Sequence, residues 1–340
     1  MKIIDKNYIS AVASSGTAMS SVYAVANMLT DYPGQAYIDN AGVSSSITVT
    51  ATLSATSAAF FLHNWLADVL EYSIDAGANW VSLSTADQNF ISSNPQFFLN
   101  SRILTKSFFI SVSMTTGNGL KIRMQSTTDR KSSQVEGNAI ANWVQDSAAT
   151  GHFTDSTPTT VSLESHGRVM LGSIVTIAAS NYQITKIIGD GTASGAITLS
   201  SAVASAAVSS IKNPCKLGIL RAGSLMSIEN ATPGFSAGFS DYSFQSEIQN
   251  GGFTRINRNV ARIYDFSISA TITNSDAIIA FARAYRKKPF ACLLLDGMPS
   301  GQNETKEFSV FATISQFPNM TFWGYLGTLR NITLRLIEVL

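Results

Sequence analysis

The side chains that most often carry catalysis or bind metals are sparse in this chain. His63, His152 and His166 are far apart and share no ligand spacing, and Cys215 and Cys292 have apolar or proline neighbours. Such neighbours predict two buried free thiols rather than a disulfide or a metal site. A Ser/His/Asp triad assembled from distant segments stays open, although no Gly-x-Ser-x-Gly motif is present. We therefore predict that the protein is not an enzyme and needs no metal or other cofactor.

Four residues could contact a carbohydrate. His63, Asn64 and Trp65 close a strand predicted at residues 59–65, and Trp80 opens another at 80–83. An indole presents a large apolar face with one polar edge, which suits stacking on a sugar ring. Packing of both tryptophans inside a β-sandwich is the competing interpretation, and it is the one that we favour.

A basic cluster ends a helix predicted at residues 276–288. The cluster consists of Arg283, Arg286, Lys287 and Lys288. Positive charge is favourable at the C-terminal end of a helix dipole, and Pro289 stops the helix. Nucleic acid in a channel is one possible partner, but the chain has 23 Lys and Arg against 22 Asp and Glu, a net charge of +1. We therefore predict no specific nucleic-acid binding. The cluster is expected to meet acidic groups of a neighbouring subunit, with Phe281 packing the helix onto a sheet.

The elements around this helix form a compact α+β unit. Residues 262–273 alternate, which places Tyr264, Ile268 and Ala270 on one face of a long half-buried strand. The segment 274–276 supplies a helix N-cap. Further strands are predicted at 290–295, 307–315 and 332–340.

The first part of the chain predicts an antiparallel sandwich of short strands. Its strands are expected at 46–53, 59–65, 69–74, 80–83, 107–114 and 120–124. Residues 116–119 predict a tight hairpin turn between the last two strands. Residues 129–160 are polar and weakly patterned, and are expected to be a long connection.

The middle of the chain predicts a small β-barrel inserted into the sandwich. Residues 162–211 offer three or four strands with little core, and an apolar strand resumes at Leu217 that would complete the sandwich. The fold class is therefore mainly β, with one helix. We divide the chain into 1–160, the sandwich and connection; 161–212, the insertion; and 213–340, the C-terminal unit.

The composition and the apolar runs indicate what kind of surface the protein has and whether it enters a membrane. Only 13% of the residues are charged, against roughly 25% in a usual soluble domain. A surface this poor in charge is typical of a β-protein with a hydroxyl-rich exterior or of one covered by neighbours. Residues 1–6 lack the apolar core of a signal peptide, and no apolar run is long enough to span a bilayer. We expect no membrane insertion, and synthesis in a cytosol.

Two groups of segments carry a resemblance. Residues 25–31, 62–64 and 70–75, with the strand 216–223, resemble the galactose-binding-like (discoidin-type) jelly rolls of bacteriophage tail and baseplate proteins. Residues 241–243, the long strand, the helix and the end at 332–339 resemble the tail-tube-like ring domain of phage distal tail proteins.

This resemblance implies a structural virion protein made in the host cytoplasm. It would form a homo-oligomeric ring, hexameric or of another cyclic order, at the distal end of a phage tail. The ring would attach tail-tube and baseplate hub proteins, and the jelly roll would point outward. The alternative is an adsorption protein that recognises a host cell-surface glycan through the jelly roll, with His63, Asn64, Trp65 and Trp80 as the binding residues.

Overall fold

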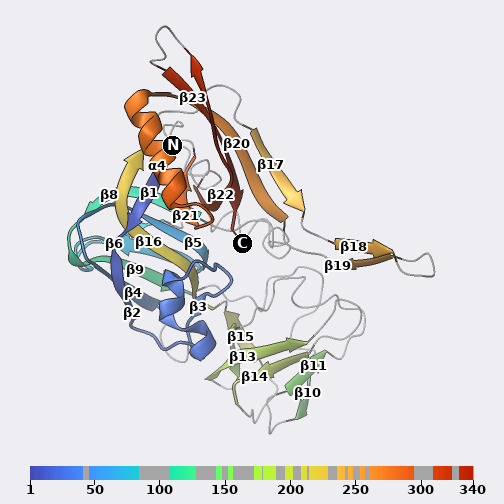
Figure 1. Ribbon diagram of the computed structural model, residues 1–340. Helices are drawn as coiled ribbons and strands as arrows, with labels where there is room; N and C mark the ends of the chain where they lie inside the picture. The colour runs from blue at the N-terminus through green and yellow to red at the C-terminus, as the bar shows by residue number, and fades with distance from the viewer. Residues whose placement is uncertain are drawn as a thin grey trace.

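The computed structural model describes most of the chain. The described residues are 1–40, 46–83, 107–127, 143–147, 152–155, 172–177, 179–188, 196–201, 208–212, 214–228, 236–241, 244–247, 253–256, 260–294, 309–323 and 329–339. Within these ranges the protein is mainly β, and its sheets are antiparallel (Figure 1). No helix within them has both the length and the apolar character required to cross a membrane.

The largest sheet contains strands from both ends of the chain. In order across it are β17 (Ser236–Asp241), β20 (Val260–Thr271), β23 (Leu329–Glu338), β22 (Ser309–Trp323), β21 (Phe290–Leu293), β1 (Lys2–Asn7), β16 (Lys216–Ser227), β5 (Ser57–Leu66) and β8 (Ser107–Met114), with β3 (Tyr37–Ile38) beside β16. The first strand of the chain thus lies between β16 and β21, a position that the sequence did not predict. The expectation that the strand from Leu217 joins the first sheet is confirmed, because β16 pairs with β5.

A bulge in β1 shapes its pairing with β16. Ile4 pairs with Leu225 and Lys6 with Ser224, so Asp5 is the extra residue. Glycine is required opposite the bulge, because a Cβ atom on Gly223 would lie 1.6 Å from the backbone oxygen of Lys6.

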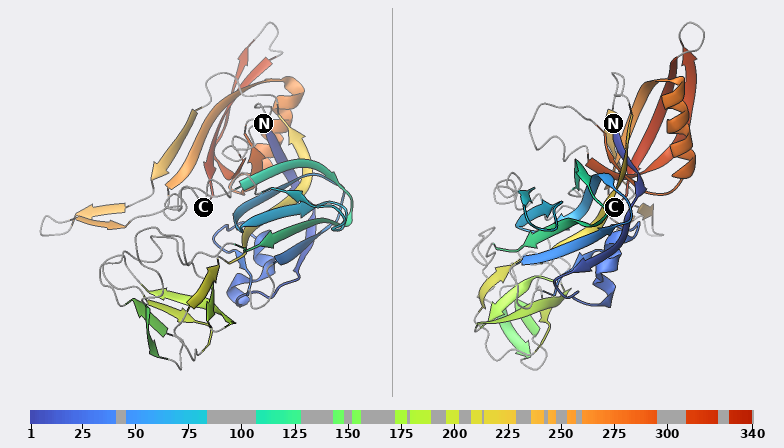
Figure 2. Two further views of the ribbon diagram at one scale, coloured as in Figure 1. Left: turned by 180° about the vertical axis from the view of Figure 1, so that it is seen from behind. Right: turned by 90° about the vertical axis from the view of Figure 1, so that its left-hand side faces the viewer.

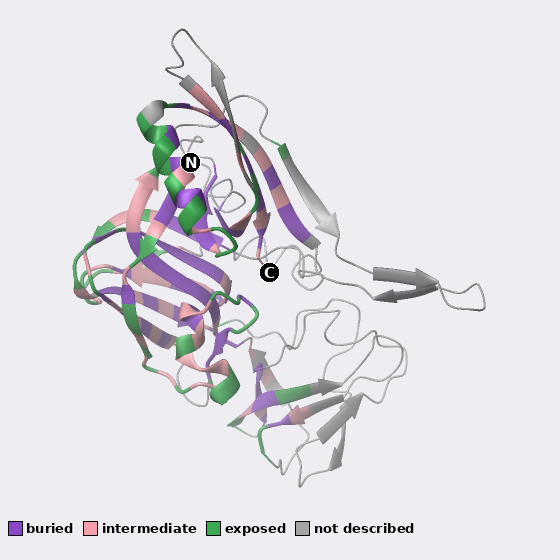
Figure 3. Cartoon of the chain, viewed as in Figure 1, coloured by how far each residue is buried: buried purple, intermediate pink, exposed green. Residues whose placement is uncertain are grey.

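A second sheet faces β16, β5 and β8 across a shared core. Its strands are β2 (Ile9–Ser14), β4 (Ser46–Leu53), β9 (Gly117–Gln125), β6 (Val69–Ser73) and β7 (Val81–Ser82). Strand β4 buries every second residue, as its alternation predicted, and Figure 3 shows this banding. Phe60 and Leu62 of β5 enter this core, whereas Phe61 faces the opposite way.

The predicted hairpin at residues 116–119 is wrong. Strand β8 pairs with β5 in the large sheet, but β9 pairs with β4 and β6 in the facing sheet. Phe108 and Met114 of β8, and Leu120 and Ile122 of β9, all enter the same core. The chain therefore crosses between the two layers instead of folding back within one.

The helix α4 (Ile272–Ala284) covers the other end of the large sheet (Figure 2). It starts and ends four residues earlier than predicted. Thr271 is the N-cap, because its side chain accepts a hydrogen bond from the Asn274 backbone, so the cap predicted at 274–276 is wrong. The packing prediction is confirmed: Ile278 and Phe281 share a core with Tyr264 and Ile268 of β20.

The large sheet curls, so that its opposite face encloses a further core. Phe61 and Phe109, from β5 and β8, lie against Phe311 of β22 and Leu293 of β21. Strand β5 consequently buries both of its faces, which explains its nearly continuous apolar sequence.

The middle of the chain forms a separate six-stranded sheet. Its order is β10 (Trp143–Ser147), β11 (His152–Asp155), β14 (Ala196–Leu199), β13 (Ser180–Ile188), β12 (Ile174–Ile177) and β15 (Val208–Lys212). Two of these strands fall in the stretch expected to be a connection, and His152, expected in a loop, pairs with Thr198. Short strands without an alternating pattern are held together by backbone hydrogen bonds, so the spacing of apolar residues in the sequence does not predict them.

Two short 3-10 helices and one hairpin complete the described chain. The helices are η1 (Ser21–Tyr23) and η2 (Val25–Leu29), and η2 packs on β16. The hairpin of β18 (Phe244–Glu247) and β19 (Phe253–Ile256) extends away from the other sheets (Figure 1). The division at residues 160 and 212 stays a prediction.

Candidate functional site

His63 lies in the core and not on a surface. Its side chain is fully buried, and its Nδ1 atom lies 2.7 Å from the Ser107 hydroxyl. The ring is near those of Phe61 and Phe311, with centroids 5.9 and 5.8 Å away. Burial lowers the pKa of His63 to about 4, and the nearby Glu338 carboxylate only partly opposes this effect. The imidazole is therefore neutral at neutral pH.

The other three predicted carbohydrate residues do not form one surface with it. Trp65 is buried and stacks on Phe108, with centroids 5.4 Å apart, so the core interpretation is confirmed for this tryptophan. Asn64 has a positive φ of 53°, and its side-chain amide donates to the Pro33 carbonyl over 2.8 Å.

Trp80 is half-buried directly before β7, which begins at Val81 and not at Trp80 as predicted, and the Arg123 guanidinium lies 4.2 Å from its ring centroid. Arg123 is itself held by Glu71 at 2.6 Å. Neither His63 nor Trp65 exposes a face to a sugar ring, so Trp80 and Asn64 are the members of the predicted set that reach solvent.

The residues predicted to support assembly separate into a buried anchor and an exposed cluster. Phe281 lies edge-on to Phe290, with centroids 4.9 Å apart, beneath α4. The four members of the basic cluster are all exposed, but only Arg283 lies in the last helical turn. The other three follow the helix, with Lys287 at a positive φ of 64°, so the helix dipole does not account for their charge. Within the described ranges none of the four makes an ion pair.

A pocket of about 200 Å³ lies beside this cluster, where β1, β16, η2 and the turn after α4 meet. Its polar lining comes from residues far apart in the chain, namely Asn7, Asp31, Arg221, Tyr285 and Lys288. Leu29 and Pro289 add apolar surface. Pockets in which a few polar groups converge on an apolar floor are the usual form of a ligand site.

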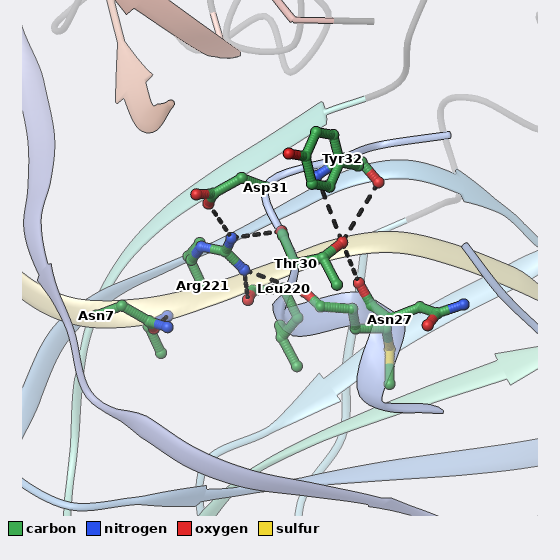
Figure 4. A network of polar contacts seen from close by, with 9 residues as sticks. Asn7, Asn27, Thr30, Asp31, Tyr32, Leu220 and Arg221 are labelled. Carbon is green, nitrogen blue, oxygen red and sulfur yellow. Dashed lines mark hydrogen bonds and ion pairs between the residues drawn. The ribbon is translucent and has the colours of Figure 1, made fainter. Parts of the chain in front are cut away.

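Arg221 organises one wall of the pocket (Figure 4). Its Nη1 atom donates to the carbonyls of Met28 and Leu220, at 3.1 and 3.0 Å. Its Nη2 atom donates to the Thr30 carbonyl at 2.6 Å and to Asp31 Oδ1 at 3.0 Å. Burial lowers the pKa of Arg221, and the Asp31 carboxylate opposes this shift. Arg221 thereby fixes the segment after η2, and with it the Asp31 carboxylate, on β16.

The opposite wall is attached to the bulge in β1. The Tyr285 hydroxyl donates to the backbone oxygen of Asp5, the residue that the bulge leaves out of register. Burial raises the pKa of Tyr285, and the Asp5 carboxylate adds to the effect. Asn7 Oδ1 accepts hydrogen bonds from the Ala222 and Ile9 backbones, at 3.2 and 3.4 Å.

Sequence reasoning missed this pocket because long-range pairing assembles it. The one signal in the sequence was Arg221 itself, a charge inside the apolar run from Leu217 to Ala222. A charged residue at a buried strand position requires polar partners from elsewhere in the fold.

The described residues include neither a cluster of metal ligands nor an exposed thiol. No three His, Cys, Asp or Glu side chains gather there as metal ligands. Cys215 and Cys292 are buried free thiols as predicted, and burial raises the pKa of both. Neither a model of a known protein family nor a curated protein sequence matches this chain.

Proposed function

We propose that the protein is a structural component of a phage-like tail tip or baseplate. In this proposal residues 213–340 are the tail-tube-like unit that forms a cyclic ring and attaches tail-tube and hub proteins. The sandwich is a jelly roll that points outward, and the six-stranded sheet belongs to the small inserted barrel. The assembled protein is located in the virion tail.

The open edge of the large sheet carries the proposal. Strand β17 pairs with β20 on one side, and no other described strand covers its second side. An uncovered edge offers backbone donors and acceptors to a strand of another chain. A ring arises when one such head-to-tail contact repeats until it closes. The hairpin β18–β19 follows β17 directly, and two strands alone are marginally stable in water, so a neighbour that covers both is expected.

The sheet face opposite α4 also suits contact with a neighbour. Asp265 and Arg335 form a two-pronged ion pair across β20 and β23, at 2.6 and 2.9 Å. Beside it the hydroxyls of Ser267 and Thr333 lie 3.3 Å apart. A face with balanced charge and many hydroxyl groups forms hydrogen-bonded, hydrated contacts rather than an apolar seal.

Light scattering and negative-stain imaging of the purified full chain test the proposal. We expect a closed ring of cyclic symmetry, whose mass is a whole multiple of the 36.3 kDa chain. A protein that stays monomeric as its concentration rises, and shows no rings in images, would refute it. Truncation of β17 together with the hairpin should abolish the ring while the sandwich stays folded.

A further inference from the structure

The pocket beside Arg221, where β1, β16, η2 and the turn after α4 meet, has the size of a small ligand. Its volume of about 200 Å³ lies below the roughly 300–1,000 Å³ of sites for drug-sized molecules. It therefore has room for a single ring and not for a chain of rings. Residues from β1, β16, η2 and the turn after α4 line it, so its shape depends on the folded protein as a whole.

The hydrogen-bonding groups of the pocket favour a hydroxylated ligand over an anion. All four terminal N–H groups of Arg221 are engaged by oxygens of the chain itself, so Nη1 and Nη2 cannot form the two-pronged contact by which arginine usually binds a carboxylate or phosphate. The Asp31 carboxylate also repels an anion at close range. A hydroxyl group suits such a site, because it can donate to a carboxylate and accept from an amide or an ammonium group.

Three side chains supply these complementary groups. Asp31 uses Oδ1 for Arg221, and its side chain is 53% exposed, so Oδ2 can accept from a ligand. Asn7 uses its oxygen for two backbone N–H groups, which leaves the amide nitrogen as the donor. Lys288 lines the pocket from the exposed turn and adds an ammonium donor. The first two are held by the fold before a ligand arrives, which reduces the entropy lost on binding.

Apolar surface completes the site. Leu29 and Pro289 line the cavity, and Tyr32, next to Asp31, is 66% exposed. Figure 4 shows the ring of Tyr32 and the carboxylate of Asp31 on the same side of Arg221. An exposed aromatic ring beside an oriented carboxylate can contact the C–H face of a sugar while the carboxylate binds its hydroxyls.

We propose that this pocket binds one neutral saccharide unit, with Asp31 accepting from its hydroxyls and Asn7 and Lys288 donating to them. The site is distinct from the four carbohydrate residues that the sequence indicated. Every group in it belongs to a single chain, so no residue of a neighbouring subunit is needed to complete the site.

Saturation-transfer NMR and calorimetric titration of the full chain test the site. The probes are methyl glycosides of neutral hexoses and N-acetylhexosamines, with glucuronate and acetate as anionic probes. We expect millimolar binding of at least one neutral glycoside and none of acetate. Asp31→Asn should weaken binding about tenfold or more, because a hydrogen bond to a charged group is lost. Lys288→Gln should weaken it severalfold.

Two matched variants control for general effects. Lys287→Gln changes the neighbouring exposed lysine outside the pocket, and Asp276→Asn changes a carboxylate paired with Arg330 at 2.5 Å elsewhere. Neither should alter binding. Asp31→Asn also weakens the ion pair with Arg221, so Lys288→Gln, at an exposed position, tests the pocket without touching that pair. The proposal fails if no glycoside binds, if binding survives both pocket variants, or if acetate binds and displaces the glycosides.

Discussion

The buried imidazole of His63 should make the protein lose stability as the pH falls. The folded-state pKa of about 4 lies below the roughly 6.5 of an unfolded chain, so the unfolded state binds the proton first. Stability is therefore complete above the unfolded pKa and falls between pH 6.5 and 4. At 1.36 kcal/mol per unit of pKa difference, the free energy of unfolding drops by about 2 kcal/mol at pH 5 and about 3 kcal/mol at pH 4.

The groups that face His63 set the size of this effect. Burial is the largest cause of the lowered pKa; Glu338 favours the charged imidazole, whereas Arg262 disfavours it. Arg262 and Glu338 neutralise each other in a buried ion pair with contacts of 2.5 and 2.8 Å. Because their effects largely cancel, desolvation decides the outcome.

The assay is urea unfolding at several pH values, on the natural protein and on His63→Gln, at one fixed protein concentration. Asp39 has the opposite effect on the pH dependence. Burial raises its pKa, so its protonation makes the folded protein more stable as the pH falls. The difference between the two proteins cancels this and other shared titrations. We expect the natural protein to lose its advantage over the variant as the pH falls from 7 to 4. Parallel curves, or an imidazole that titrates near its usual pKa by NMR, would refute the reasoning.

The remaining predictions concern the helix, the basic cluster, the middle sheet and metals. Phe281→Ala should cost about 3–5 kcal/mol of unfolding free energy, measured by urea titration, whereas Arg283→Ala on the exposed side should cost little; equal melts for both would contradict the packing. Arg286→Glu combined with Lys287→Glu should leave circular dichroism unchanged and weaken assembly in sedimentation, and full assembly of this variant would place the cluster outside the contact. Replacement of residues 143–212 by a Gly/Ser bridge should leave the melting of the remainder intact, because the strands described there pair with one another and with no described strand of the other sheets. Collapse of the remainder would argue against an insertion. Calcium should not shift the melting temperature, and an upward shift of several degrees would reveal a metal site.

Local patterns in the sequence predicted the elements whose faces have different surroundings. Strand β4 has one buried and one half-exposed face, so its alternation gave both its bounds and its orientation. Strand β20 and the apolar side of α4 were recognised for the same reason. The period of the apolar residues shows that one face of an element is buried, and this can be seen without knowing which element packs against it.

The errors arose where long-range pairing decides the structure. Strand β1 is only six residues long, and its position between β16 and β21 depends on segments more than 200 residues away. The turn after β8 has the composition of a hairpin, but the facing sheet offered β9 two partners. Helix α4 begins at Ile272, earlier than predicted, because the hydroxyl of Thr271, the last residue of β20, caps it. A pocket built from the ends of such elements has no local sequence pattern.

The sandwich and the helix-backed sheet share strands β5 and β16, and His63 lies on β5. Phe60 and Leu62 of β5 enter the sandwich core, and Ala59 and Phe61 enter the core against Phe311. Strand β16 does the same with Leu220 and Ile219. Loss of either core would expose apolar surface of the other, so we expect the sandwich and the helix-backed sheet to unfold as one cooperative unit. Protonation of His63, which lies on a strand shared by both parts, is therefore expected to destabilise the sandwich and the helix-backed sheet together.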